Sequence, residues 1–255
     1  MSDALVQQAT LFIALTLRPA ALLLAAPPFA APFVPSALRV FLGAALALLL
    51  LPGYAHTHPG ASPDLAVFVS EPLVGLILAF TLRLAFAAVQ FAGDLLDIDT
   101  GVSLSQYLDP VTGSPVQIVS GLQTNLALVL FLSLGGHQSL LRGLADSYDR
   151  LPLGGVHWNL ALTQQAVALA GGLFSDGLRM ALPVLTATML ATIALGAATR
   201  AFPEANAFAL GQPIKLLAAL IALTALLPLY GAIYGDLFAR AESGGLHLLN
   251  LLTAP

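Results

Sequence analysis

The chain has 255 residues, of which 58% are hydrophobic and 9% are charged, and its mean hydropathy is +0.90. That much apolar surface exceeds what a soluble core of this size can bury, so the composition predicts an integral membrane protein. The net charge of -4 offers no basic surface for nucleic acid, and without cysteine the chain can form neither disulfides nor thiolate metal sites.

Hydrophobic blocks dominate the chain, and nearly every one of them contains a proline or a charge. Blocks of about twenty apolar residues are long enough to cross a bilayer as helices, whereas proline removes a backbone donor and bends or ends a helix. The pattern predicts an all-α, polytopic membrane protein with about six kinked hydrophobic helical blocks in one domain, residues 1–255. We place the blocks at residues 5–26, 37–51, 65–92, 116–134, 160–200 and 208–234.

Three blocks have breaks or lengths that bear on the fold. Pro19, directly after Arg18, should bend the first block, and Pro52 should end the second after about fifteen residues, which is marginal for a crossing. The fifth block is too long for one crossing, and Gly171-Gly172, Asp176, Arg179 and Pro183 within it favour a helical hairpin or a broken helix. Between the fourth and fifth blocks, residues 138–150 have leucines at helical spacing and are expected to form an amphipathic helix.

Two opposite charges, Glu71 and Arg83, lie inside the third block. A charge at the middle of a membrane costs about 2.5–3.5 kcal/mol on insertion scales, so both side chains should face protein or water rather than lipid. We expect them either to pair structurally inside a helical assembly or to form a proton or ion relay, because buried ionisable groups often mark transport pathways.

An acidic stretch, residues 85–115, separates two hydrophobic blocks and contains no lysine or arginine. If the helix of the third block continues to Leu96, two of its aspartates lie three residues apart on one face, where they repel each other unless water or a partner neutralises them. Beyond that point, Pro110 and two glycines predict a short amphipathic hairpin at an interface or inside a protein assembly. The aspartates of the stretch are Asp94, Asp97, Asp99 and Asp109.

Catalysis and metal binding find little support in these residues. Asp99, Thr100 and Gly101 match the triplet of aspartic proteases, but the sequence contains no second triplet. The aspartate spacing lacks the alternating ligands and terminal glutamate of an EF-hand loop, and the five histidines are scattered. We therefore predict no catalytic, cofactor-binding or metal-binding residues, and interpret the stretch as an acidic hairpin that faces solvent or an assembly.

A series of longer signatures follows in order along nearly the whole chain. They read RPAALLLAAPPF, VPSALRVFLGAALALLLLP, AFAAVQFAGDLLDIDTGVSLSQYLDP, GGHQSLLRGLADSYDRLPLGG, RMALPVLTATML and FPEANAFALGQPIK. In this order and spacing they resemble the FliR/SctT family, the export-gate proteins of flagellar and virulence type III secretion systems. Details such as the Gly136-His137 pair and Gly211 before Pro213 favour the flagellar branch.

This resemblance implies a non-enzymatic subunit without a cofactor, assembled in a helical, hetero-oligomeric gate of the bacterial inner membrane, at the flagellar basal body or injectisome base. Its implied partners are FliP/SctR-like and FliQ/SctS-like gate subunits, an FlhB/SctU-like switch protein, membrane lipid and the unfolded substrates that pass through the channel. The residues that we expect at assembly or gate contacts are Glu71, Arg83, Asp94, Asp97, Asp99, Asp109, Pro110 and Lys215.

Other interpretations remain open beside the flagellar gate. A virulence gate subunit of the SctT type would carry the same signatures. A stand-alone secondary transporter would use Glu71, Arg83 and the aspartates as a relay, and it should be stable and active when expressed alone. An intramembrane protease would require Asp99.

Overall fold

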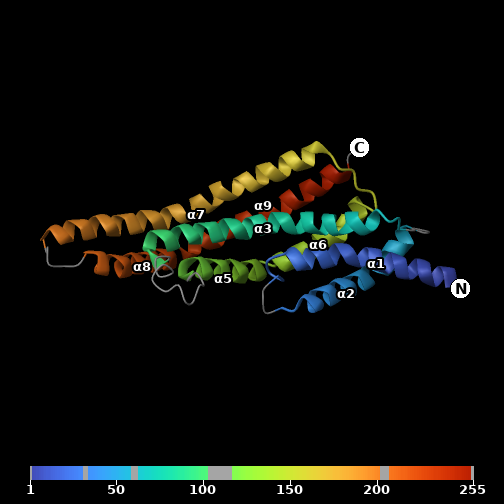
Figure 1. Ribbon diagram of the computed structural model, residues 1–255, viewed down its shortest axis with the longest axis horizontal. Helices are drawn as coiled ribbons and strands as arrows, with labels where there is room; N and C mark the ends of the chain where they lie inside the picture. The colour runs from blue at the N-terminus through green and yellow to red at the C-terminus, as the bar shows by residue number, and fades with distance from the viewer. Residues whose placement is uncertain (1, 31–33, 59–62, 103–116, 202–206, 254–255) are drawn as a thin grey trace. The chain divides into compact units, whose positions relative to one another are not determined.

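The computed structural model describes residues 2–30, 34–58, 63–102, 117–201 and 207–253, most of which are helical (Figure 1). No strand occurs within these ranges, so the prediction of an all-α fold is confirmed. The helices are α1 (Ser2–Ala25), α2 (Ser36–Thr57), α3 (Val67–Thr100), α5 (Ile118–Ser133), α6 (Gly136–Arg150), α7 (Leu160–Ala201), α8 (Ala207–Ala225) and α9 (Leu227–Thr253).

Several of these helices have the length and the apolar composition of membrane spans. Among the described residues, four helices qualify alone: α1, α2, α3 and α7. The number rises to six if two bent pairs, α5 with α6 and α8 with α9, each count as one span. The helices therefore agree with the predicted polytopic membrane protein of about six hydrophobic blocks.

Two predicted breaks are absent from the structure, and one break that was not predicted is present. Helix α2 continues through Pro52 to Thr57, and α7 is a single helix of 42 residues that contains Pro183, so the predicted stop and the predicted hairpin are both wrong. The last block instead divides at Leu226 into α8 and α9. An unwound segment in apolar surroundings would leave many backbone groups without hydrogen bonds, whereas a proline inside a helix leaves only one or two.

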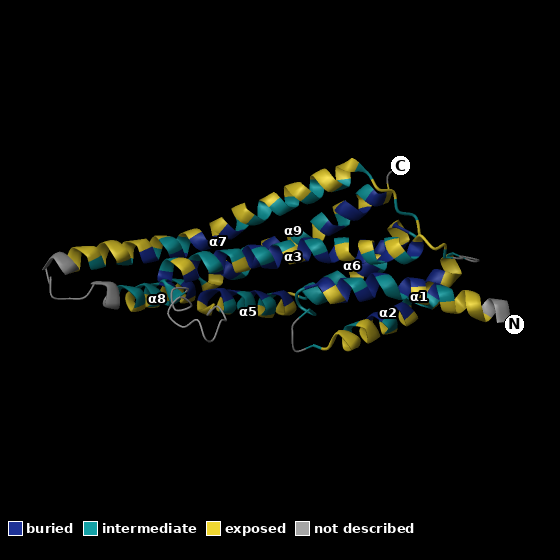
Figure 2. Ribbon diagram, in the orientation of Figure 1, coloured by how far each residue is buried: buried dark blue, intermediate teal, exposed yellow. Residues whose placement is uncertain are grey.

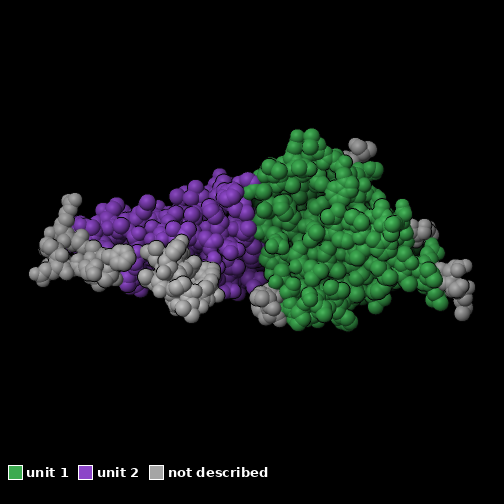
Figure 3. Space-filling view, viewed as in Figure 1, with its two compact units in different colours: residues 1–85, 135–170, 238–255 green, residues 86–134, 171–237 purple. Residues whose placement is uncertain are grey.

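The chain divides by packing into two compact units, which are described separately (Figure 3). Unit 1 consists of residues 1–85, 135–170 and 238–255, and unit 2 of residues 86–134 and 171–237. Helices α3, α7 and α9 contribute residues to both units. The organisation as a single domain stays a prediction.

In unit 1, α1 packs closely against both α2 and α3 because glycines stand at the points of contact. A Cβ atom at Gly43 of α2 would lie 2.9 Å from the backbone of Ala20, and one at Gly75 of α3 would overlap the carbonyl oxygen of Arg18. Small residues of this kind let the backbones of membrane helices approach each other. This close packing places the side chain of Arg18 against α3.

The end of α9 completes unit 1. The backbone amide of His157 donates a hydrogen bond to the carbonyl of Leu252 over 2.9 Å, and the side-chain amide of Asn159 donates to the carbonyl of Leu251 over 2.6 Å. These bonds satisfy carbonyls in the last turn of α9, where a helix has no partners of its own. They fasten the last helix to the connector between α6 and α7.

Aromatic contacts hold unit 2 together. The rings of Phe86 on α3 and Phe131 on α5 meet edge to face at 5.9 Å, and those of Phe91 on α3 and Phe174 on α7 meet at 5.4 Å. The hydroxyl of Tyr230 on α9 donates to a backbone carbonyl of α7 over 2.9 Å. Edge-to-face ring pairs stabilise packing beyond the burial of apolar surface. Because one ring of each pair belongs to α3, its C-terminal half packs against both α5 and α7.

Two helices leave long apolar faces uncovered in the single chain. Only 11% of the apolar window of α2 and 22% of that of α7 is buried, and Figure 2 shows exposed residues recurring along both helices. Phe41 and Leu49 on α2 and Ile193 on α7 are each more than two-thirds exposed. Apolar surface of this extent suits lipid or neighbouring subunits rather than water.

Candidate structural and assembly site

An ion pair lies at the centre of unit 1. Nη2 of Arg18 on α1 stands 2.7 Å from Oε2 of Glu71 on α3, and Nε of the same arginine donates to that oxygen over 2.8 Å. Both side chains are 0% exposed. Opposite charges removed from water need each other, and hydrogen bonds to their remaining polar atoms, to persist in such a place.

The surrounding backbone and side chains supply those hydrogen bonds. Nη1 of Arg18 donates to the hydroxyl of Ser147 on α6 over 2.9 Å, and Nη2 donates to the carbonyl of Leu151 over 3.0 Å. The second carboxylate oxygen of Glu71 accepts from the backbone amide of Gly154 over 3.3 Å. The pair therefore ties α1 and α3 to α6 and to the connector that follows it.

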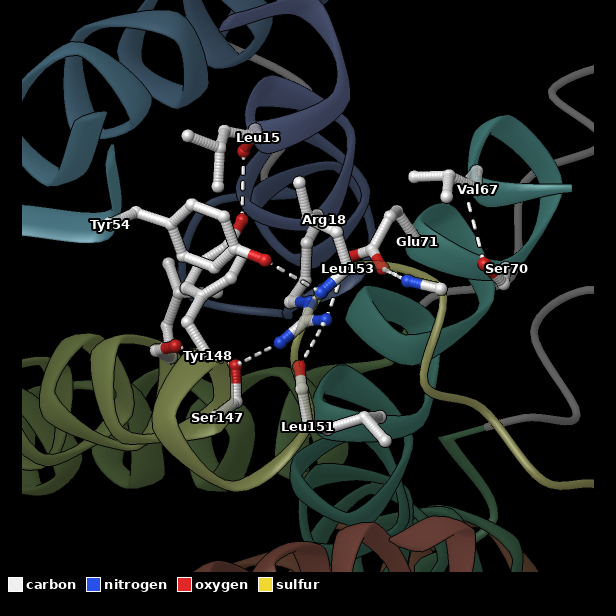
Figure 4. A network of polar contacts seen from close by, with 12 residues as sticks. Leu15, Arg18, Tyr54, Val67, Ser70, Glu71, Ser147, Tyr148, Leu151 and Leu153 are labelled. Atoms are coloured by element: carbon white, nitrogen blue, oxygen red, sulfur yellow. Dashed lines mark hydrogen bonds and ion pairs between the residues drawn. The ribbon is translucent and has the colours of Figure 1, made fainter. Parts of the chain in front are cut away.

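Two tyrosines close this network (Figure 4). The guanidinium carbon of Arg18 lies 4.1 Å from the centre of the Tyr148 ring, a cation–π contact, and the Tyr148 hydroxyl donates to the carbonyl of Leu15 over 2.8 Å. The hydroxyl of Tyr54 on α2 accepts from the amide of Leu153 over 2.9 Å. With this last bond the network also includes α2.

A second polar cluster lies in unit 2, where α3 ends and α5 begins. Oδ1 of Asp97 accepts from the backbone amide of Val119 over 2.9 Å, and Oδ2 accepts from that of Ser120 over 3.0 Å. Both amides belong to the first turn of α5, which has no side-chain cap of its own at Gln117. A carboxylate from another helix thus caps α5 and neutralises the partial positive charge of its N-terminus.

The neighbouring aspartates make weaker contacts in the same cluster. Oδ1 of Asp94 accepts from the side-chain amide of Gln117 over 3.3 Å. The ammonium group of Lys215 on α8 lies 3.4 Å from Oδ1 of Asp99 and donates to the Asp99 carbonyl over 3.2 Å. The three aspartates therefore have separate partners, which offset part of the repulsion expected between carboxylates on one helix face.

The predicted site residues are thus distributed over distinct places. Glu71 is buried and pairs with Arg18 rather than with Arg83, which is exposed on α3. Asp109 and Pro110, with most of the predicted hairpin, lie outside the described residues. Within the described ranges, no group of three metal-binding side chains gathers. The roles of the predicted residues in assembly or gating stay proposals.

Sequence reasoning missed Arg18 as a site residue. Arg18 lies inside the first apolar block, where a charge has the same significance as Glu71 and Arg83 in the third block. The position of this charge in an apolar block identifies Arg18 as a candidate for a buried, paired side chain, but it does not indicate which carboxylate is the partner. Ser147 and Leu151 gave no signal, because a hydroxyl and a backbone carbonyl are unremarkable until the fold places them beside a guanidinium.

These features define a class of protein: an all-α, polytopic membrane protein whose intramembrane charges hold helices together. Comparisons with known proteins make the class specific. The family described as "Bacterial export proteins, family 1" matches residues 9–241, and the chain belongs to this family.

Named relatives agree with the family. The chain is 34% identical over 237 residues to the flagellar biosynthetic protein FliR of Escherichia coli, a match covering 88% of this chain and 87% of that one. It is 28% identical to FliR of Bacillus subtilis over 71% of each chain. It is also 30% identical to the surface presentation of antigens protein SpaR of Shigella flexneri, over 59% of this chain and 58% of that one.

The predicted resemblance to the FliR/SctT family is thereby confirmed. The chain is an export-gate subunit of the flagellar type III kind, and it resides in the bacterial inner membrane. It is a structural or transport component of the type III export apparatus.

Proposed function

We propose that this chain contributes helices to the wall of the channel through which unfolded proteins leave the cytoplasm, and that it performs no catalysis itself. The main support for this proposal is that its buried polar groups are engaged in contacts between helices. Arg18 and Glu71 are fully buried against each other, and Asp97 caps a helix. Groups committed to such contacts serve to hold a shape, and they are poorly suited to a proton relay, which must exchange protons with water.

The partners that we propose are FliP/SctR-like and FliQ/SctS-like gate subunits and an FlhB/SctU-like switch protein. The uncovered face of α7 supports partners of this kind, because it is too apolar to face water. Unfolded export substrates and membrane lipid complete the proposed contacts.

The test is affinity purification of the tagged full chain from its own host in a mild detergent, followed by mass spectrometry of the proteins that accompany it. We expect FliP-type and FliQ-type subunits in constant proportion to the bait, and none with an unrelated polytopic membrane protein tagged in the same way. A lone protein would contradict the proposal and favour the stand-alone transporter.

A virulence role is the second candidate, because the chain is also 30% identical to SpaR. The same purification distinguishes the two, since the accompanying subunits are of the flagellar or the virulence type. Deleting the gene gives an independent answer: we expect loss of flagella, whereas flagellated cells that fail to secrete effectors would favour the virulence role.

A further inference from the structure

A narrow exposed stripe runs along the part of α3 that belongs to unit 1. Its members are separated by alternating steps of four and three residues, and the side chains between them, such as Val74, Leu78 and Leu82, are buried. This spacing is the seam of a helix that packs along another helix. The stripe, called the α3 seam below, consists of Val69, Leu73, Leu76, Phe80 and Arg83, of which Phe80 is half-buried and the others are exposed.

Arg83 at the end of the α3 seam needs a partner that the described part of the chain does not supply. The positions one turn away on its own helix are apolar: Ala79, Phe80, Phe86 and Ala87. Among the described residues nothing forms a hydrogen bond or ion pair with it. It stands midway along the 34 residues of α3, with apolar turns on both sides. A guanidinium in such a place requires a carboxylate, backbone carbonyls or water.

The side chains of the α3 seam indicate whether lipid, water or another protein helix covers it. Lipid suits the four apolar members but not Arg83, and a water-filled channel suits Arg83 but not the apolar members. A packed helix that carries a carboxylate suits both. In residues 37–49 of α2, by contrast, the exposed side chains are all apolar, as at Phe41, Leu48 and Leu49, and lipid can cover that face.

We propose that the α3 seam docks a membrane helix of another gate subunit, and that this helix presents an aspartate or glutamate to Arg83. The inference rests on the proposed function, since it requires a partner subunit. The planar guanidinium of arginine binds a carboxylate through two parallel hydrogen bonds, which fixes the register of two helices as well as their attraction. The apolar members of the seam supply the packing.

Photo-crosslinking in the native host tests which molecule covers the seam. A photoreactive phenylalanine analogue replaces Leu76, which is 44% exposed, and in a matched strain it replaces Leu49 of α2, which is 77% exposed. From position 76 we expect a crosslink to another gate subunit, at a peptide with an acidic residue within about two helical turns of the crosslinked site. A crosslink to lipid alone, to an export substrate, or to a peptide without an acidic residue would overturn the proposal.

Charge reversal tests the ion pair. Arg83→Glu should lower the amount of gate subunits recovered with the tagged chain at least ten-fold, and Arg83→Lys, which keeps the charge but not the planar fork, should lower it less. Replacing the acidic residue found by crosslinking with arginine should restore recovery with Arg83→Glu. The matched control is Arg142→Glu on the polar helix α6, which should change nothing. Unchanged recovery with Arg83→Glu, or no rescue by the reversed partner, would refute the pairing.

The proposed function and the docking role of the α3 seam are tested by different outcomes. If the wild-type chain brings no gate subunit with it, the proposed function is wrong. If the wild-type chain brings them but position 76 never crosslinks to one, only the α3 seam is wrongly assigned. The crosslink uses a chain that keeps Arg83, so this result does not depend on the folding of the charge-reversed variant.

Discussion

Arg18 and Glu71 form an ion pair of 2.7 Å although 53 residues separate them in the sequence. Each side chain would be strongly unfavourable in apolar surroundings without the other. Their hydrogen bonds reach α6 and the connector after it, so the pair stabilises the packing of unit 1 at the point where its segments meet.

Removing one charge of this pair should destabilise the protein strongly. Glu71→Gln keeps the shape of the side chain but leaves the Arg18 guanidinium buried without a counter-charge, which costs about 3–5 kcal/mol. For a chain of this size the thermal midpoint should fall by roughly 6–20 °C. The midpoint of the purified protein in mild detergent measures this.

The double variant Glu71→Leu with Arg18→Met provides the control for that experiment. It removes both charges, so it should be more stable than Glu71→Gln, although it also loses the hydrogen bonds that Arg18 donates to Ser147 and Leu151. A double variant less stable than Glu71→Gln would mean that the ion pair is not the source of the effect.

The cap that Asp97 provides for α5 should stabilise the protein about as much as a cap formed by a residue of the same helix. Asp97→Ala removes the acceptors of two amides and is expected to cost about 1–2 kcal/mol. Asp94→Ala loses only a 3.3 Å bond to Gln117 and should cost less. Hydrogen exchange at the first turn of α5 distinguishes the two: the amides of Val119 and Ser120 should exchange faster in Asp97→Ala alone.

The close approach of α1 and α3 should make Gly75 intolerant of even one methyl group. In Gly75→Ala the new Cβ meets the backbone of Arg18, which cannot rotate away as a side chain can, so we expect a loss of about 1–3 kcal/mol. Gly53→Ala on α2 adds the same methyl where nothing lies within 4 Å, and alanine favours a helix over glycine by about 1 kcal/mol. Thermal midpoints that fell equally in both variants would contradict this account.

The pair of Lys215 and Asp99 should contribute little to stability. Each side chain is 22% exposed and the charged atoms are 3.4 Å apart, a geometry typically worth under about 1 kcal/mol. Lys215→Met should therefore leave the thermal midpoint within a few degrees of the wild-type value. If secretion nevertheless fails in a stable Lys215→Met protein, the residue acts in gating or assembly; normal secretion would remove it from the proposed contacts.

Composition and block length predicted the class of protein and most of the helices, because a membrane admits only segments whose backbone bonds are satisfied internally. The same principle explains where prediction failed. Pro52 and Pro183 were expected to interrupt helices, as they do in water, but apolar surroundings make an interruption more costly than one missing hydrogen bond.

The partner of Glu71 could not be predicted from sequence distance. Arg83 is near in the chain, but at 1.5 Å and about 100° per residue it lies roughly 18 Å along the helix and on a different face. Arg18 is far away in the chain and adjacent in the fold, through contacts that depend on the packing of three helices. The capping role of Asp97 was equally hidden, because it depends on where α5 begins relative to α3.

The buried pair of Arg18 and Glu71 also bears on when the first helix can insert into the membrane during synthesis. Arg18 is made with the first helix, and at about 5–20 residues per second the ribosome needs roughly 3–11 s more to make Glu71. Leu151 lies 133 residues after Arg18, so the last acceptor of the guanidinium follows it by roughly 7–27 s. During this interval the nascent first helix carries an uncompensated charge, and it must stay at the interface or against the insertion machinery until its counter-ion arrives.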